Sequence, residues 1–186
     1  IAGEGEVFIQ EANDYGYPVM PFHEGGCYPG CTPFPKPYAP PYPGLSRLGM
    51  GGTGLSGLAL SDAASGWPEP YAGVFYVANP VTQRVQAVKL FRDGPRWSLV
   101  KLPDFLRSSD EWFRPVAIHF GPDGCLYVVD WYNKVISHNE VPRDHPDRDR
   151  SRGRIWRVRR AGQPRRAPAD FTRLAGADLL RHLGGE

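Results

Sequence analysis

The chain has 186 residues, with 22 Lys and Arg against 20 Asp and Glu, which gives a formal net charge of +2. So small a charge creates no strong field for nucleic acid or an anionic membrane, and no nucleic-acid partner is expected. Hydrophobic residues make up 41% of the chain, enough for a core, while 22 glycines and 20 prolines favour short strands and many turns over a helical bundle. No apolar run approaches the ~20 residues needed to cross a bilayer, so we expect no membrane span.

A turn followed by a buried strand occurs three times along the chain. Residues 3–9, 71–77 and 121–130 each combine a glycine-containing turn with a run rich in β-branched and aromatic residues. The third copy, GPDGCLYVVD, is the clearest, because Pro presets φ for a tight turn and Gly accepts a positive φ. These copies predict the buried strands of a repeated unit.

Further strands are predicted on both sides of the second and third copies. Short apolar strands precede them at residues 57–60 and 115–120, and alternating strands follow at 85–90 and 154–158, as expected for outer, half-exposed strands. Repeats of this kind are typical of a β-propeller, and three units are too few for a ring of typically 4–8 blades. We therefore predict an all-β fold of about two and a half blades over residues 1–160, in a segment of a longer protein.

Two insertions and a helical end complete the predicted organisation. Residues 14–54 are rich in proline and aromatics, which predicts either an ordered surface loop or a loop that covers a site. Residues 131–152 contain DHPDRDR at positions 144–150, whose alternating charges predict a solvated, self-neutralising loop. Residues 161–169 form a basic, proline-containing linker, and residues 170–186 begin a helical region with Asp170 as its N-cap.

Metal ligands and cysteines give weak patterns. Three cysteines, an odd number, form neither a disulfide framework nor a haem attachment site. His23, Cys27 and Cys31 leave open a zinc site, a Cys27–Cys31 disulfide, or loop cysteines without a special role. Asn13 and Asp14 follow the first buried strand and could supply oxygen ligands to Ca²⁺. These patterns alone assign no metal centre.

Three stretches resemble a known group of proteins. They are residues 110–133 (DEWFRPVAIHFGPDGCLYVVDWYN), 136–140 (ISHNE) and 153–158 (GRIWRV). Together they resemble the propeller domain of the large bacterial membrane-bound dehydrogenase proteins. Those proteins are similar to the glucose/sorbosone dehydrogenase family, whose relatives use pyrroloquinoline quinone (PQQ). In them, HEAT-type helical repeats and a c-type cytochrome domain follow the propeller, so residues 170–186 fall where HEAT-like repeats would begin.

The resemblance implies a function and a set of cofactor-binding residues. It implies oxidation of a sugar or alcohol by PQQ, with Ca²⁺ as a further cofactor, transfer of electrons to a cytochrome, and an extracytoplasmic or periplasmic location. PQQ carries three carboxylates, and an arginine side chain suits each of them because a guanidinium group can donate two parallel hydrogen bonds to a carboxylate. The relatives' Arg-x-Arg pattern matches Trp112 and Arg114, so only the second arginine is kept, and Arg84 is the nearest match to a lysine of the relatives. Alternatively, Arg114 pairs with Asp130 or Glu111 and holds neighbouring blades together.

Other candidate residues follow the third buried strand. Asp130, Trp131, Tyr132 and Asn133 either cap the next turn or face the cofactor in the cleft. His138 is the candidate catalytic base, because the unperturbed pKa of histidine lies near ~6.5; the alternative is a structural or exposed loop histidine.

Two other classes of function compete with the dehydrogenase hypothesis. One is a non-catalytic propeller that binds a glycan or protein partner, with Trp112, Trp131 and Tyr132 stacking on sugar rings. The other is a calcium-dependent hydrolase of the lactonase kind, which needs an inner ring of Glu, Asn and Asp. Residues 55–60 and 115–120 lack such a ring, which counts against the hydrolase.

Overall fold

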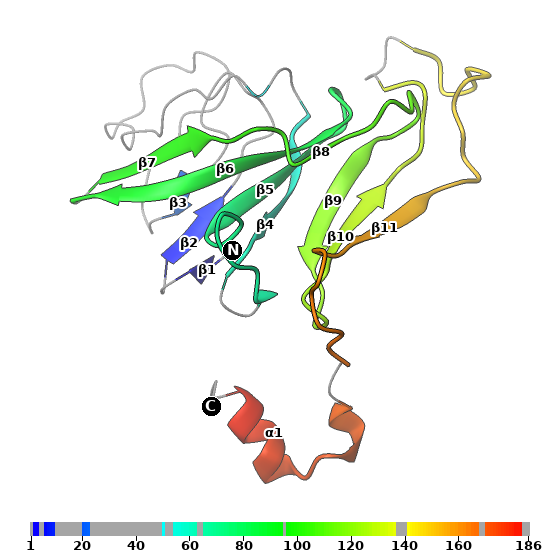
Figure 1. Cartoon of the computed structure of the whole chain (residues 1–186). Helices are drawn as coiled ribbons and strands as arrows, with labels where there is room; N and C mark the ends of the chain where they lie inside the picture. Colours follow the sequence, from blue (N-terminus) through cyan, green and yellow to red (C-terminus); the bar gives the residue numbers. More distant parts are fainter. Residues whose placement is uncertain are drawn as a thin grey trace, which may run out of the picture.

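The chain folds mainly into antiparallel β-sheets, with a short helical end (Figure 1). The computed structural model describes residues 2–3, 6–9, 20–22, 50, 54–62, 65–94, 96–136, 141–167 and 170–183. In this part of the chain no helix is long and apolar enough to cross a membrane.

The largest sheet has five strands and occupies the middle of the chain. Its strands are β4 (Ser56–Leu60), β5 (Val74–Asn79), β6 (Arg84–Asp93), β7 (Arg96–Lys101) and β8 (Leu106–Arg107). They lie in the order β4-β5-β6-β7, and β8 also pairs with β6. All six residues of β5 are buried, as predicted for the second buried strand.

Two smaller sheets flank the middle one in sequence. One contains β9 (Pro115–Phe120), β10 (Leu126–Asp130) and β11 (Arg154–Val158) in the order β11-β10-β9. The other contains β1 (Ala2–Gly3), β2 (Glu6–Ile9) and β3 (Met20–Phe22) in that order. Every pairing in the three sheets is antiparallel.

The predicted inner, buried and outer strands occur in the predicted order in the second and third units. Four strands were not predicted, and two of them, β1 and β8, have only two residues each. β3 lies inside the proline-rich insertion, where we expected only loop. β7 forms a hairpin with the outer strand β6, which ends at Asp93, three residues later than predicted. The count of two and a half blades stays a prediction.

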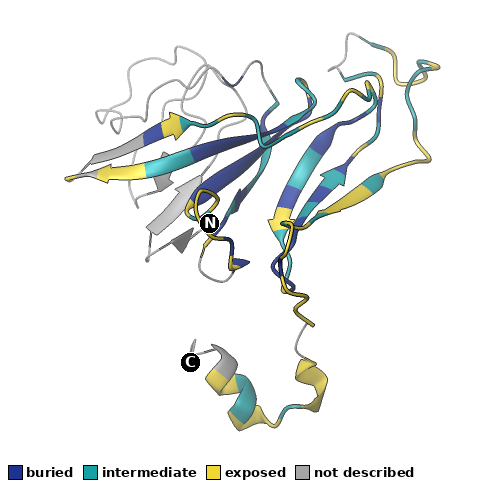
Figure 2. Ribbon diagram, in the orientation of Figure 1, coloured by how far each residue is buried: buried dark blue, intermediate teal, exposed yellow. Residues whose placement is uncertain are grey.

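The five-stranded sheet and the β9–β11 sheet pack together through their first strands and enclose a shared core. Its buried residues come from both sheets: Ala59, Trp67, Val74, Tyr76, Ala78, Val85, Ala87, Phe113, Ile118, Leu126 and Val128. Because successive strand residues point to opposite faces, Phe75 and Val77 of β5 contribute to a second cluster, with Met50, on the other face of the same sheet. Figure 2 shows this burial along β5 and β10.

The predicted helical end consists of two short elements. Asp170 is the N-cap of a 3₁₀ helix at Phe171–Arg173, where its carboxylate accepts from the Thr172 N–H, and α1 follows at Gly176–Leu183. In Figure 1, α1 lies apart from the sheets. Leu180 on α1 is exposed.

The turn before β10 ties three parts of the chain together. Gly124 has φ +73°, and a Cβ there would lie 2.8 Å from the Ser65 carbonyl oxygen, so the turn requires glycine for both conformation and space. The Gly124 carbonyl accepts from Trp67 Nε1 at 2.8 Å and from Gln163 Nε2 at 2.9 Å. The turn therefore connects the β9–β11 sheet to the middle of the chain and to the linker.

The carboxylate of Asp123 holds this turn against β10 and β11. It accepts from the Cys125 N–H at 3.0 Å, from Tyr127 Oη at 3.0 Å and from Arg157 Nε at 2.9 Å. Burial raises the pKa of Asp123, but the hydrogen bonds from Cys125, Arg157 and Tyr127 outweigh burial and lower the pKa to about 2.

We expect acid to destabilise the protein partly through Asp123. Because its pKa is lower in the folded chain, the carboxylate contributes stability above the ordinary Asp pKa, and this contribution is lost as pH falls through about 2. Urea unfolding between about pH 6 and pH 2 should show a fall in stability that is smaller in Asp123→Asn. An equally steep fall in the variant would show that Asp123 does not contribute.

Candidate functional site

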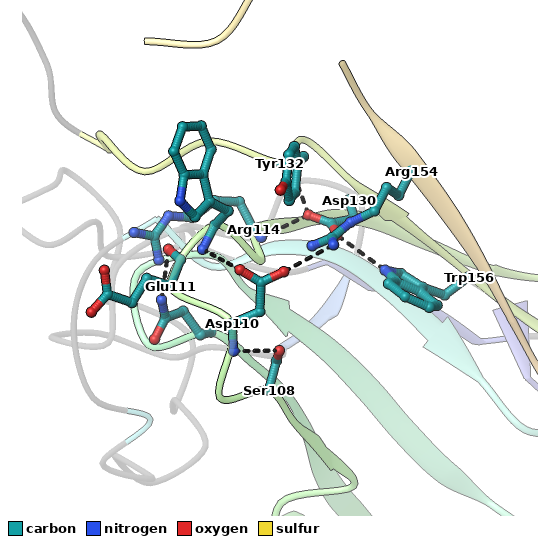
Figure 3. Close-up of polar contacts among 10 residues, drawn as sticks. Ser108, Asp110, Glu111, Arg114, Asp130, Tyr132, Arg154 and Trp156 are labelled. Carbon is teal, nitrogen blue, oxygen red and sulfur yellow. Dashed lines mark hydrogen bonds and ion pairs between the residues drawn. The ribbon is translucent and has the colours of Figure 1, made fainter. Parts of the chain in front are cut away.

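Asp130, at the end of β10, is the centre of a buried polar cluster (Figure 3). It is 1% exposed, and the register of β9 and β10 shifts between Val129 and Asp130. Its Oδ1 accepts from the backbone N–H groups of Arg114 at 2.8 Å and Tyr132 at 2.9 Å. Its Oδ2 accepts from Arg154 Nε at 2.7 Å and Trp156 Nε1 at 3.0 Å. Asp130 thus caps the next turn and also joins β9, β10 and β11.

Arg154 links this cluster to Asp110. Its Nη1 lies 2.9 Å from Asp110 Oδ2, while its Nε pairs with Asp130. A hydrogen bond from the Trp112 N–H and the nearby Arg154 guanidinium hold the pKa of Asp110 below its usual value, although desolvation opposes them. Both carboxylates therefore serve to orient one guanidinium group.

Aromatic rings and guanidinium groups stack beside the Asp130 cluster. The Trp112 and Tyr132 ring centroids are 5.3 Å apart, and Arg152 Cζ lies 5.5 Å and 5.2 Å from them. Arg154 Cζ lies 3.9 Å from the Tyr132 centroid and 5.1 Å from that of Trp156. These distances are in the range of cation–π attraction, so the arginines and rings hold one another in place.

The guanidinium group of Arg114 is not free to bind a carboxylate of a cofactor. It is 7% exposed, and all three guanidinium nitrogens donate to backbone carbonyls: Nε to Asn133 at 2.9 Å, Nη1 to Pro80 at 3.1 Å and Nη2 to Lys134 at 2.9 Å. Burial lowers its pKa, an effect that Asp130 and Glu111 partly offset. Arg114 therefore joins the β5–β6 turn to the loop after β10, and Asp130 contacts its backbone rather than its side chain.

Two other residues predicted to bind PQQ, Arg84 and Asn133, also make polar contacts within the protein. Arg84 pairs with Asp104 at 3.1 Å, and Arg107 shares that carboxylate at 2.7 Å. Asn133 is buried, and its Nδ2 donates to the Asp149 carbonyl at 2.8 Å. The guanidinium of Arg114, Nη1 of Arg84 and the amide of Asn133 thus donate to protein oxygens, which does not fit a site where these groups grip PQQ carboxylates in this conformation.

Several sequence-based candidates lie outside the described residues. They are Asn13, Asp14, His23, Cys27, Cys31 and the candidate base His138. Within the described ranges, no three His, Cys, Asp or Glu side chains are grouped to hold a metal ion. Cys125 is a buried free thiol, and burial raises its pKa.

Two adjoining hollows lie on either side of residues 148–150. One, of about 390 Å³, is lined by Trp112, Pro146, Arg148, Asp149, Arg150, Ser151 and Arg152. The other, of about 420 Å³, is lined by Trp131, Asn133, Arg143, Arg148, Asp149 and Arg150. Both volumes are in the range of small-molecule sites, roughly 300–1,000 Å³. Trp131, which we predicted as a site residue, is 38% exposed at the second hollow.

Sequence reasoning missed the arginines of these hollows. The loop at residues 131–152 was predicted to neutralise its own charges, and its residues 141–152 are called the arginine loop from here on. Asp149 does pair with Arg152, and Asp147 pairs with Lys134 at 3.5 Å. Arg143 and Arg150, however, form no ion pair with a carboxylate among the described residues. The excess of arginine over acidic residues in this loop was the available signal.

The fold assigns the chain to a structural class. It is similar to the crystal structure of an oxidoreductase from Thermus thermophilus that is described as a glucose dehydrogenase. The TM-score is 0.53 with 23% identity over 83% of this chain and 41% of that one, so the chain spans less than half the length of this relative. At this identity the likeness shows the fold, which is glucose dehydrogenase-like.

The family follows from a direct sequence match. Residues 50–162 match a family model described as a domain of unknown function (DUF7133), and these residues are more than half of the chain. The chain belongs to this family. No curated protein matches the chain significantly.

Proposed function

We propose that this chain is part of a glucose dehydrogenase-like β-propeller and that its arginine loop binds saccharides. The observation that carries the proposal is the pair of adjoining hollows, each lined by one tryptophan and several arginines. Tryptophan offers a broad apolar face for a sugar ring, and guanidinium N–H groups donate hydrogen bonds to hydroxyl oxygens.

The Asp130 cluster supports this proposal because it fixes one wall of the site. Trp112 and Tyr132 stack beneath Arg152, and Tyr132 is positioned by its hydrogen bond to Asp130. Asn133 holds the arginine loop through the Asp149 carbonyl. A preformed site loses less conformational entropy on binding than a flexible loop would.

The test is calorimetric binding of cellotriose, a neutral oligosaccharide, to the intact protein. We expect saturable binding that weakens at least about tenfold in Trp131→Ala, which corresponds to about 1.4 kcal/mol. Phe91→Ala is the matched control, because Phe91 is 45% exposed on β6 and lines neither hollow. Undiminished binding by Trp131→Ala, or none by the folded protein, would reject the site.

A second candidate is a PQQ-dependent sugar or alcohol dehydrogenase, favoured by the likeness to a structure described as a glucose dehydrogenase. Residues 110–133 also resemble the bacterial membrane-bound dehydrogenases. In this proposal the protein holds PQQ together with Ca²⁺, electrons pass to a c-type cytochrome, and the protein works outside the cytoplasm. Titration of the intact protein with PQQ, with and without Ca²⁺, decides it: a folded protein that binds sugar but not PQQ is a binding module.

A further inference from the structure

The hollow beside Trp131 carries an excess of positive charge. Arg143, Arg148 and Arg150 line it, and Asp149 is its one acidic residue. Arg143 and Arg150 pair with no carboxylate among the described residues, so this wall carries positive charge that a site for neutral sugars alone would not need. The charge therefore suggests that the ligand is an anion.

The carboxylate of Asp149 is bound by its neighbours Ser151 and Arg152. Its Oδ1 accepts from the Ser151 N–H at 2.8 Å, from Ser151 Oγ at 2.9 Å and from the Arg152 N–H at 3.1 Å, and its Oδ2 pairs with Arg152 Nε. Hydrogen bonds from the Ser151 backbone, and then from Arg152, lower the pKa of Asp149 to about 2. Asp149 is therefore ionised at neutral pH, and its negative charge is paired with Arg152 rather than with Arg143 or Arg150.

Two of these arginines, Arg148 and Arg150, donate to backbone carbonyls of the loop itself. Arg148 donates to the carbonyls of Val141 at 3.0 Å and Pro142 at 2.9 Å, and Arg150 Nη2 donates to the Arg143 carbonyl. Backbone hydrogen bonds His145 N–H to Pro142 O and Arg148 N–H to His145 O close two further turns of the loop. Arg143 and Arg150 thus retain unpaired charge, within the described part of the chain, on an ordered loop.

We propose that this hollow binds an acidic saccharide, with a uronate carboxylate at Arg143 and Arg150 and a sugar ring against Trp131. This inference rests on the proposed saccharide function and names the ligand class for one of its two hollows. A guanidinium group matches a carboxylate with two parallel hydrogen bonds, and the exposed Trp131 face lies in the same hollow. A uronic acid has both groups in one molecule: a carboxylate for the arginines and a sugar ring for Trp131.

The test compares two probes that differ by one group, cellobiouronic acid and cellobiose, by calorimetry on the intact protein. We expect the acid to bind at least about tenfold more tightly at low salt, with the preference shrinking as added salt screens the exposed charges. The double variant Arg143→Gln/Arg150→Gln should lose the preference, so that the acid and cellobiose bind with equal affinity whatever the change in cellobiose binding itself. Arg165→Gln, an exposed arginine on the linker, should behave as the unmodified protein.

Each outcome separates this inference from the proposed function. Equal binding of both probes would overturn the acidic-saccharide inference and leave saccharide binding intact. Binding of the acid that inorganic phosphate displaces equally well, and that Trp131→Ala does not weaken, would indicate a general anion site and overturn the inference. Absence of binding by either probe to the folded protein would reject both.

Discussion

Replacing Asp130 with alanine is expected to lower the free energy of unfolding by about 3 kcal/mol or more, because losing its buried carboxylate leaves several hydrogen-bond donors without an acceptor. The carboxylate is fully buried and accepts four hydrogen bonds. Without it, the N–H of Arg114 loses its acceptor in a buried setting, and Arg154 keeps only Asp110 as an ionic partner. An unsatisfied buried donor costs about 1–3 kcal/mol, so several such losses account for a large effect.

Denaturant unfolding of the intact protein measures this change, and Asp147→Ala provides the control. Asp147 and Lys134 form an exposed pair at 3.5 Å, and such pairs contribute about 0–1 kcal/mol. Trp156 fluorescence should also change in Asp130→Ala, because its Nε1 loses its acceptor. If the two variants lose equal stability, Asp130 does not join the three strands as described.

The local elements of this fold could be predicted because their signals are contained in short stretches. The Pro122-Asp123-Gly124 turn and the apolar run after it define β10, and the polar alternation of residues 154–158 defines an exposed outer strand. β7 was missed because its alternation is short and includes three polar residues out of six. β3 was missed because proline content was taken to exclude a strand.

The site could be predicted only in part, because its contacts are between residues far apart in sequence. Asp130, Tyr132 and Asn133 were singled out as polar and aromatic residues at a strand end, and capping by Asp130 is confirmed, while their contact with a cofactor stays a prediction. The side chain of Arg114, however, is bound by carbonyls from Pro80, Asn133 and Lys134. Only the packing of two sheets brings these carbonyls together, and no motif in the sequence records that convergence.

The other large effect is expected at Gly57, where β4 meets β9. Gly57 has φ +65° and lies where the register of β4 and β5 shifts between Ser56 and Leu58. A Cβ at this position would lie 2.9 Å from both Ala117 Cα and Ile118 N. These are backbone atoms of the neighbouring sheet, which cannot rotate away as a side chain can. Glycine here lets the first strands of two sheets approach backbone to backbone.

Gly57→Ala should therefore lower the free energy of unfolding by about 2–4 kcal/mol, combining about 1 kcal/mol of left-handed backbone strain with about 1–3 kcal/mol of overpacking. Gly73→Ala is the matched control, since Gly73 has φ +66° with nothing within 4 Å of an added Cβ, and only the strain should remain. The difference between the two variants in urea unfolding isolates the contact between the sheets. Equal losses would mean that β4 and β9 do not touch at Gly57. A larger loss at Gly57 would show that the close backbone approach of β4 and β9 contributes to stability.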